Sequence, residues 1–297
     1  MSPPLSASRR QVLREAQRGD DAGAPLQGIC KAARAVVLLG WLANTGCVIV
    51  HKPPGVPFHG TASQPGLLQL MRSQQGQDSF PYEGPLFPVH RLDYLTSGCL
   101  ILATSSEAAG ELVAAFRARA VHKFYVALSD RRPSKKMGSV VGDMQKGRRG
   151  SWKLARTSEQ PSITRFTSAA VSAERPLRAF LLKPETGRTH QLRVALKSLG
   201  APVLGDERYA QKEAASQEDR GYLHCAALRF ELGGTAVQCV CPPEDGIEFL
   251  RPEFRSLFDT WLPQSLQQDT GLWFDDNKLL RSELQLAGSK LQEASRT

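Results

Sequence analysis

The segment PVHRLDYLTSGCLILA, residues 88–103, places three polar side chains directly before a turn and an apolar run. In extended backbone, alternate residues point to the same side, so Arg91 and Asp93 share a face while His90 points the other way. A turn at Gly98 follows, and CLILA, 99–103, is typical of a strand buried on both faces. We therefore expect Asp93 to be held on a rigid element, where it caps a loop, pairs with an arginine or does chemistry.

Composition and charge describe a globular protein with an excess of positive charge. The 297 residues are enough for one large domain or two small ones, and 41% are hydrophobic against 23% charged. Lysine and arginine number 38 and acidic residues 29, which gives a formal net charge of +9. The excess predicts a polyanionic partner such as nucleic acid, although a solvated surface has the same composition.

Six cysteines are scattered without the CxxC spacing of a zinc site, so we expect no metal and a reducing compartment. Cys239 and Cys241 lie at i and i+2 of a strand-like run and are interpreted as buried thiols. No run reaches the roughly 18 to 20 apolar residues of a membrane-spanning helix, so no membrane partner is expected. The longest apolar stretch, 35–50, is interrupted by a turn signal at Asn44-Thr45-Gly46, which predicts a strand hairpin.

Residues 36 to 250 have the pattern of one continuous domain. Short strands punctuated by proline and glycine alternate irregularly with helices and show no internal repeat, which predicts an α+β architecture. Residues 1–35, rich in arginine and alanine, are interpreted as a disordered or targeting extension, and residues 251–297 as a C-terminal extension. The expected location is cytoplasmic, or a mitochondrion or plastid if the first segment is a transit peptide.

Two helices are predicted from capping and periodicity. The first begins at Thr104, which forms a capping box with Glu107, and it presents Leu112 and Phe116 to the core. The second, THQLRVALKSLG at 189–200, begins with Thr189 as N-cap and has an apolar stripe of leucines.

Charged residues line the other side of the second helix. His190, Arg193 and Lys197 lie at i, i+3 and i+7. A solvated face is the default interpretation of such a stripe.

The strand VHKFYVAL, residues 121–128, alternates cleanly. Phe124, Val126 and Leu128 are predicted to point to the core, and Lys123 and Tyr125 to the opposite, half-exposed face. A tyrosine on such a face is most often a good strand former without further function.

Residues 135–156 form the most basic stretch of the chain. Seven lysines and arginines stand against Asp143, with four glycines between them. This pattern suits a mobile arm that follows a phosphate backbone, with Trp152 as a stacking surface, and it also suits an ordinary surface loop.

Three ordered blocks resemble the RluA-type pseudouridine synthases. His90-Arg91-Leu92-Asp93 with the following Thr96-Ser97-Gly98 is similar to the first motif of that family, and FRARAVHKFYVAL at 116–128 to the second. ETGRTHQLRVALKSLGAPVLGDERYA, residues 185–210, is similar to the third. An entry strand with a Lys-Pro-x-Gly turn, CVIVHKPPG at 47–55, and a late Leu-His strand extend the resemblance over roughly 36 to 245.

The resemblance implies a single catalytic domain built on a mixed, mostly antiparallel sheet flanked by helices, with the catalytic cleft across the sheet. It implies that a uridine in RNA becomes pseudouridine: the N1–C1′ bond breaks, the uracil turns, and C5 is joined to C1′. No cofactor and no metal are needed. The partner is a uridine in a structured segment of ribosomal or transfer RNA, and the protein is expected to be a monomer.

Four residues receive roles around the target uridine by the same resemblance. Asp93 is the catalytic carboxylate, which either attacks C1′ or removes the 2′ proton. Arg193 pairs with Asp93, orients it and favours its charged form. Tyr125 lies against the uracil and serves in removing the C5 proton, and Arg91 enters the space that the everted nucleotide leaves.

Phosphate contacts are assigned to a wider set of basic residues. The candidates are Lys52, His190, Lys146, Arg148 and Arg149.

Two departures from the family pattern bear on the substrate. The third motif of the family usually continues with a histidine where this chain has Ala195, so that contact is absent. The first 45 residues are too short and irregular for the separate RNA-binding module of many relatives, so substrate choice is expected to depend on the catalytic domain and the basic stretch.

Two other functions fit parts of the pattern. A ribonuclease would use His90 or His190 with Asp93 as acid and base, although the strand geometry turns His90 away from Asp93. A non-catalytic RNA-binding protein would keep the fold, but it would have no need for a buried acid next to a phosphate-rich partner.

Overall fold

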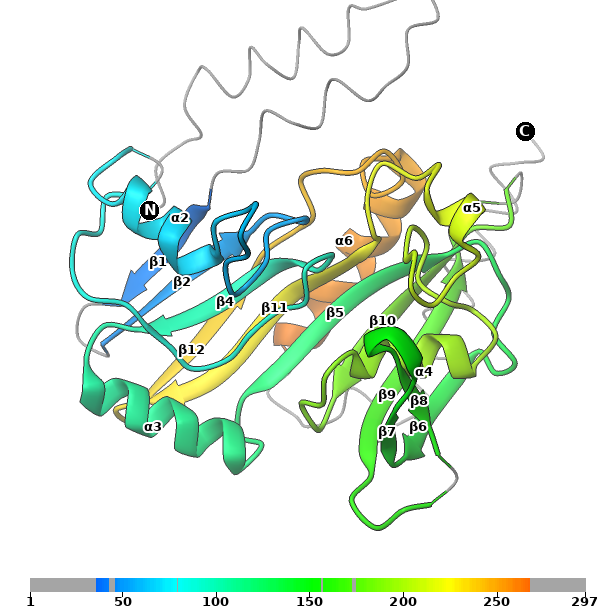
Figure 1. The fold of residues 1–297 in the computed structure, drawn as a ribbon, viewed down its shortest axis with the longest axis horizontal. Coiled ribbons are helices and arrows are strands. Elements are labelled where there is room, and N and C mark those ends of the chain that lie inside the picture. Colours follow the sequence, from blue (N-terminus) through cyan, green and yellow to red (C-terminus); the bar gives the residue numbers. More distant parts are fainter. Residues whose placement is uncertain (1–35, 43–45, 79, 156, 173–174, 268–297) are drawn as a thin grey trace, which may run out of the picture. The chain divides into compact units, whose positions relative to one another are not determined.

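The computed structural model describes residues 36–42, 46–78, 80–155, 157–172 and 175–267 (Figure 1). The predicted extension at 1–35 and the end of the predicted C-terminal extension, 268–297, lie outside the described residues.

A mixed, mostly antiparallel sheet forms the centre of the domain. Ten strands belong to it, in the order β1-β2-β4-β11-β5-β10-β9-β6, with β12 paired to β11 and β3 to β4. The pair β4–β11 is parallel and the other pairs are antiparallel. The strands are β1 (Val37–Leu42), β2 (Cys47–Lys52), β3 (Phe87–Pro88), β4 (Ser97–Ala103), β5 (His122–Ser129), β6 (Met137–Gly142), β9 (Ser162–Ala170), β10 (Arg178–Pro184), β11 (Leu223–Leu232) and β12 (Thr235–Val240).

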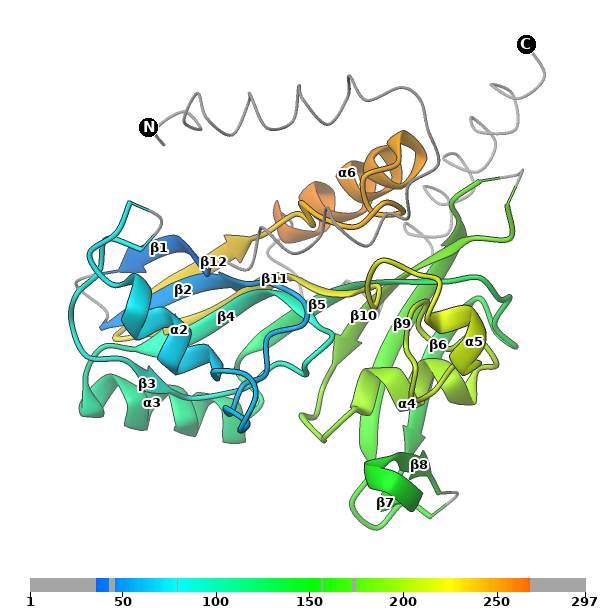
Figure 2. The same cartoon turned by 45° about the horizontal axis from the view of Figure 1, so that its top comes forward.

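Helices cover the two faces of this sheet (Figure 2). Apolar side chains of α2 (Leu67–Gln74), α3 (Ser106–Arg117) and α4 (Gln191–Ser198) belong to one hydrophobic cluster, and those of α6 (Pro252–Gln267) to a second. A short helix, α5 (Lys212–Ala215), follows α4. The fold class expected from the sequence, α+β with a sheet flanked by helices, is confirmed.

The strand that follows the opening motif is buried along its whole length. Every residue of β4 is buried, because β2 and β11 flank the strand and both faces of the sheet are covered. The predicted hairpin before it is confirmed as β1 and β2, which pair antiparallel.

The alternation predicted for β5 is confirmed, but the exposure is not. Val126 and Leu128 pack in the cluster with α6, while Tyr125 and Ala127 belong to the cluster on the other face. Tyr125 is only 7% exposed, because α3 and α4 cover the face that the sequence pattern suggested was half open.

Both predicted helices begin one residue later than expected. Ser105, not Thr104, caps α3, and its side chain accepts a hydrogen bond from the backbone N–H of Ala108. His190, not Thr189, is the N-cap of α4 and has left-handed backbone. The expected apolar faces are buried, including Leu112 of α3 and Leu196 of α4.

The core continues beyond residue 250. Phe254, Leu257, Phe258 and Trp261 of α6 are buried in the second cluster, together with residues of β5, β10 and β11. This part of the predicted C-terminal extension therefore belongs to the folded domain.

In the described ranges, no helix is long and apolar enough to cross a membrane, and no group of three or more histidine, cysteine or acidic side chains is placed to hold a metal ion.

The turn that the sequence predicted at Gly98 lies earlier, at residues 94–95, and Gly98 is the second residue of β4. The close contact at this glycine provides the sharpest test of the fold. Gly98 has φ of +108°, and a Cβ there would lie 2.2 Å from the carbonyl oxygen of Cys225 on β11. We expect Gly98→Ala to lower the free energy of unfolding by about 3 kcal/mol or more, since both the backbone conformation and the contact oppose a side chain. Urea denaturation measures this change.

Gly110 of α3 provides the matched control. A Cβ at Gly110 has nothing within 4 Å, and the residue lies in a helix interior, so Gly110→Ala should stabilise the fold by up to about 1 kcal/mol. Equal effects of the two substitutions would contradict the role given to the β4–β11 contact.

Candidate active site

A cleft of about 630 Å³ lies on the face of the sheet that α3 and α4 cover. Its walls come from the segment before β4, the C-terminal end of α3, β5, the β10–α4 loop and α4. In Figure 1, α3 and α4 stand on either side of β5. A volume of this size is typical of small-molecule sites and admits a nucleoside.

Asp93 lies in this cleft, four residues before β4. Its backbone carbonyl accepts a hydrogen bond from the N–H of Thr96, which closes a turn, and its side chain remains 18% exposed. Arg193 Nη1 lies 3.3 Å from Asp93 Oδ2. The sequence prediction that these residues, 100 positions apart, form a pair is matched by the structure.

Arg193 makes stronger contacts to a second carboxylate. Its Nε and Nη2 donate to the two oxygens of Asp206, each at 2.8 Å, and its guanidinium carbon lies 4.9 Å from the ring centre of Tyr209. Burial lowers the pKa of Arg193, but the hydrogen bonds and charge of Asp206, with a smaller contribution from Asp93, raise it overall. The side chain is 6% exposed, so the predicted solvated face of α4 is wrong at this position.

Asp206 is the functional residue that the sequence interpretation missed. It is fully buried, and it also accepts a hydrogen bond from the backbone N–H of Arg208. A signal was present in APVLGDERY, where Asp206 directly follows a run of apolar residues and glycine, because an acid that is buried there requires a cation. Gly205 before it has φ of +73°, and a Cβ there would lie 1.9 Å from the Arg220 carbonyl oxygen.

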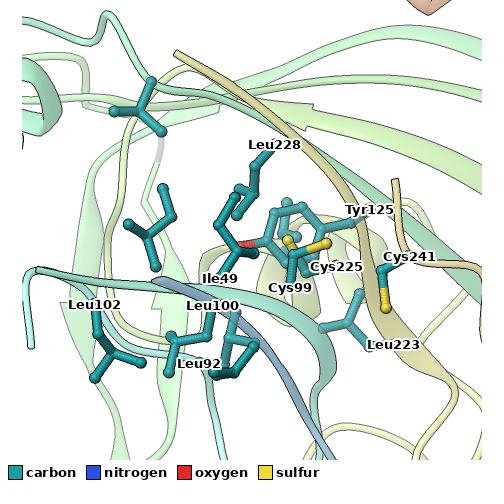
Figure 3. Close-up of a cluster of buried hydrophobic side chains, with 14 of the residues drawn as sticks. Ile49, Leu92, Cys99, Leu100, Leu102, Tyr125, Leu223, Cys225, Leu228 and Cys241 are labelled. Carbon is teal, nitrogen blue, oxygen red and sulfur yellow. The ribbon is translucent and has the colours of Figure 1, made fainter. Parts of the chain in front are cut away.

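Tyr125 lines the cleft from β5 and lies in a cluster of buried side chains that includes Cys99, Cys225 and Cys241 (Figure 3). Cys225 lies opposite Tyr125 on β11, and its thiol is close to the phenol. Burial, then the neighbouring Cys225, raises the pKa of Tyr125, so the group is a neutral phenol at physiological pH. Cys241 is buried as predicted, whereas Cys239 is half-buried.

Unpaired arginines surround the cleft. Arg91, Arg117, Arg119 and Arg188 line it and are exposed, and none has an ion-pair partner among the described residues. The two acids of the lining are both paired: Asp93 with Arg193, and Glu185 with Arg165 at 3.1 Å. The cleft therefore carries an excess of positive charge, which suits a polyanion.

His190 lines the same cleft and connects it to the basic stretch. Its Nδ1 lies 2.8 Å from the hydroxyl of Tyr209, and that hydroxyl accepts a hydrogen bond from the backbone N–H of Trp152. The hydroxyl still has its proton to donate; when it donates to Nδ1, the proton of the neutral imidazole is on Nε2. Burial lowers the pKa of His190, which favours this neutral form.

The basic stretch 135–156 is folded. After β6 it forms a hairpin of β7 (Met144–Lys146) and β8 (Trp152–Leu154), joined by the short 3-10 turn Arg148–Gly150. Arg208 fixes the hairpin by donating to the carbonyl of Arg149. The predicted mobile arm is thus an ordered hairpin, and its Lys146, Arg148 and Arg149 are exposed. Arg156, counted in the basic stretch, lies outside the described residues.

Lys52 is not available to a phosphate. The residue is fully buried, and its Nζ donates to the carbonyls of Pro53 and Val56 at 2.9 Å and of Tyr94 at 3.5 Å. Burial, then the nearby charge of Arg220, lowers the pKa of Lys52 to about 7. Its predicted phosphate contact is therefore wrong: Lys52 supports the backbone next to Asp93.

His90 has a structural partner as well. Its Nε2 accepts the backbone N–H of Ile101 at 2.8 Å, and its ring stacks on Phe116. Burial, then the charge of Lys123, lowers the pKa of His90 to about 3. A histidine that is neutral and already bonded in this way is a poor acid or base, which argues against the form of the ribonuclease alternative that uses His90.

Comparisons with known proteins agree with this geometry. The family model described as RNA pseudouridylate synthase matches residues 46–198. An "Uncharacterized RNA pseudouridine synthase" of Haemophilus influenzae is 43% identical over 205 residues, which cover 69% of this chain and 87% of that protein. Ribosomal large subunit pseudouridine synthase C of Escherichia coli O157:H7 is 32% identical over 252 residues, covering 80% of this chain and 75% of that protein.

A solved structure shows the same fold. Human RNA Pseudouridylate Synthase Domain Containing 1 superposes with a TM-score of 0.58 at 26% identity, covering 71% of this chain and 84% of that chain. With these matches and the three motifs gathered around one cleft, the chain belongs to the RluA-type family of RNA pseudouridine synthases and is a pseudouridine synthase.

Proposed function

We propose that this enzyme converts a uridine in a structured segment of ribosomal or transfer RNA to pseudouridine, with Asp93 as its catalytic carboxylate. One observation carries the proposal: Asp93 lies in a nucleoside-sized cleft, in contact with an arginine that is itself fixed by a buried acid. The unpaired arginines around the cleft fit the phosphates of RNA.

Asp93 is placed for chemistry at the sugar. Among the described residues its side chain accepts one hydrogen bond, from Arg193, so its second oxygen is left to face the cleft. That oxygen either attacks C1′ or removes the 2′ proton while the N1–C1′ bond breaks. The uracil then turns, C5 bonds to C1′, and C5 loses its proton while N1 gains one, so that the product is an isomer.

Tyr125 supports the uracil and keeps water out. Its neutral ring forms part of the cleft wall, and its side chain is buried next to Cys225. A buried, protonated phenol is a poor base in the free enzyme, so we assign Tyr125 the packing role that the family resemblance implies and leave the C5 proton to a base that the bound RNA completes.

A target in structured RNA must leave its stack to reach Asp93. Unstacking costs a few kcal/mol, and a side chain that fills the vacated space offsets part of this. Arg91, exposed two residues from Asp93 at the edge of the cleft, is our candidate for that insertion.

The hairpin of β7 and β8 and His190 are proposed to hold the RNA backbone. Lys146, Arg148 and Arg149 are exposed on a hairpin that Tyr209 and Arg208 tie to the wall of the cleft. In the tautomer in which Tyr209 donates to Nδ1, His190 presents its Nε2–H as a donor. The choice of ribosomal RNA is supported by the E. coli relative, which is named for the large ribosomal subunit. We also propose that the protein acts as a monomer.

Asp93→Asn should lower isomerisation by at least about 1000-fold, because an amide neither attacks C1′ nor accepts the 2′ proton. RNA affinity should stay within about threefold, since phosphate contacts dominate it. Tritium release from RNA with 5-tritiated uridine measures the rate. The control is Asp259→Asn on α6, an exposed acid outside the cleft, and normal tritium release by Asp93→Asn would rule out the assigned role.

Arg193→Lys should lower kcat about 10- to 100-fold. Lysine keeps the positive charge, but its ammonium cannot donate the two parallel hydrogen bonds to Asp206 and the third to Asp93 that the planar guanidinium donates. The matched control is Arg251→Lys, since Arg251 holds Glu248 through two hydrogen bonds outside the cleft. A folded Arg193→Lys enzyme with unchanged kcat would show that the geometry around Asp93 is not critical.

Neutralising Lys146, Arg148 and Arg149 to glutamine should reduce the slope of log K against log salt concentration by about 0.7 to 0.9 for each phosphate that the hairpin no longer neutralises. The decrease in affinity should therefore be largest at low salt, and the curves should converge as salt rises. Filter binding over a salt series measures this.

A control for the hairpin variant removes three exposed charges that do not line the cleft, Arg72, Arg131 and Lys212. A hairpin variant whose slope equals that of the wild type would exclude the hairpin from the RNA interface.

A further inference from the structure

Three residues other than glycine have left-handed backbone in the described part of the chain. They are Arg119 (φ 60°), Arg149 (φ 53°) and His190 (φ 57°). This conformation is unfavourable for residues with a side chain, and such strain is concentrated at functional sites. Arg119 and His190 line the cleft, and Arg149 belongs to the hairpin next to it.

Arg119 occupies the position at which a helix normally ends in glycine. After α3, the N–H of Ala120 bonds to the carbonyl of Ala115 and the N–H of Arg119 to that of Phe116, which is the Schellman pattern. The residue in the left-handed position of this pattern is usually glycine, because glycine has no Cβ to oppose the conformation.

Helix α4 ends in the same pattern and uses the expected residue. There the N–H of Ala201 bonds to Leu196 and that of Gly200 to Lys197, with φ of +77° at Gly200. Two helices on the same face of the sheet thus end alike, but only the one whose end lines the cleft carries an arginine in the strained position.

The side chain of Arg119 makes no polar or ring contact with the rest of the described fold. Arg119 is exposed, and within the described ranges its side chain has no ion pair, no hydrogen bond and no ring contact. Its neighbours in the cleft wall, Arg91 and Arg117, are also exposed cations without an ion-pair partner there. On the side of α4, Arg188 and His190 face the same cleft.

We propose that Arg119 binds a phosphate group of the RNA on the α3 side of the cleft, opposite the contacts from the hairpin of β7 and β8. This inference rests on the proposed function and extends it, because it gives the RNA a second anchor on the other side of the everted uridine. The planar guanidinium donates two parallel hydrogen bonds to phosphate oxygens, and that interaction offsets the strain of the backbone only when RNA is bound.

The test separates binding from folding. Arg119→Gly and Arg119→Asn both remove the charge, and both residues tolerate left-handed backbone. We expect the melting temperature of each to stay level or rise by about 2 °C. The Kd for substrate RNA should rise about 10-fold at low salt, and the slope of log K against log salt concentration should fall by about 0.7 to 0.9.

Two control variants calibrate these values. Arg72→Ala removes an exposed helical arginine outside the cleft and should change neither Kd nor slope. Gly200→Arg places an arginine in the left-handed position at the end of α4, as the chain itself does at the end of α3. Nothing lies within 4 Å of the new Cβ, so only the strain of the left-handed backbone acts, and we expect the melting temperature to fall.

Wild-type affinity and slope in Arg119→Gly would overturn the inference, as would a clear fall in its melting temperature, which would indicate a structural role for the arginine. Failure of the proposed function is a different result: the wild-type protein would release no tritium from uridine-labelled RNA, whatever the affinity of the Arg119 variants.

Discussion

The guanidinium of Arg193 makes two hydrogen bonds to Asp206 and one longer one to Asp93, and the geometry of the site depends on this difference. Asp206 accepts hydrogen bonds from Nε and Nη2, each at 2.8 Å, whereas Asp93 accepts one from Nη1 at 3.3 Å. A buried arginine without Asp206 would be free to turn its fork fully towards Asp93 and occupy both oxygens. Because Asp206 already holds the fork, Asp93 is oriented by a single contact and keeps an oxygen for the sugar.

The fold supplies the three residues from separate elements. Asp93 lies before β4, Arg193 on α4, and Asp206 in the loop after α4. The start of β4 is fixed by the contact of Gly98 with β11, and the backbone next to Asp93 is held by the buried Lys52, whose ammonium donates to the Tyr94 carbonyl. Buried polar groups of this kind are stable only while each has its partner, so the surroundings of Asp93 are rigid.

The sequence predicted the features that depend on local residue patterns and on the family motifs. The apolar run after Gly98 indicated a buried strand, the alternation of β5 indicated the shared side of Lys123 and Tyr125, and the family resemblance indicated the Asp93–Arg193 pair. The partner on the far side of Arg193 could not be predicted, because Asp206 is recruited by tertiary packing. For the same reason Lys52 and Tyr125 were expected to be accessible: only the packing of α3 and α4 and the loops shows which faces are covered.

The most direct test of the central claim is a crystal structure of the Asp93→Asn enzyme with an RNA oligonucleotide that contains the target uridine. We expect the uridine to be everted into the cleft, with C1′ within about 3.5 Å of the substituted side chain at position 93 and the uracil against Tyr125. A complex in which the uridine remains stacked in its helix, or in which the RNA leaves the cleft between α3 and α4 empty, would contradict the claim.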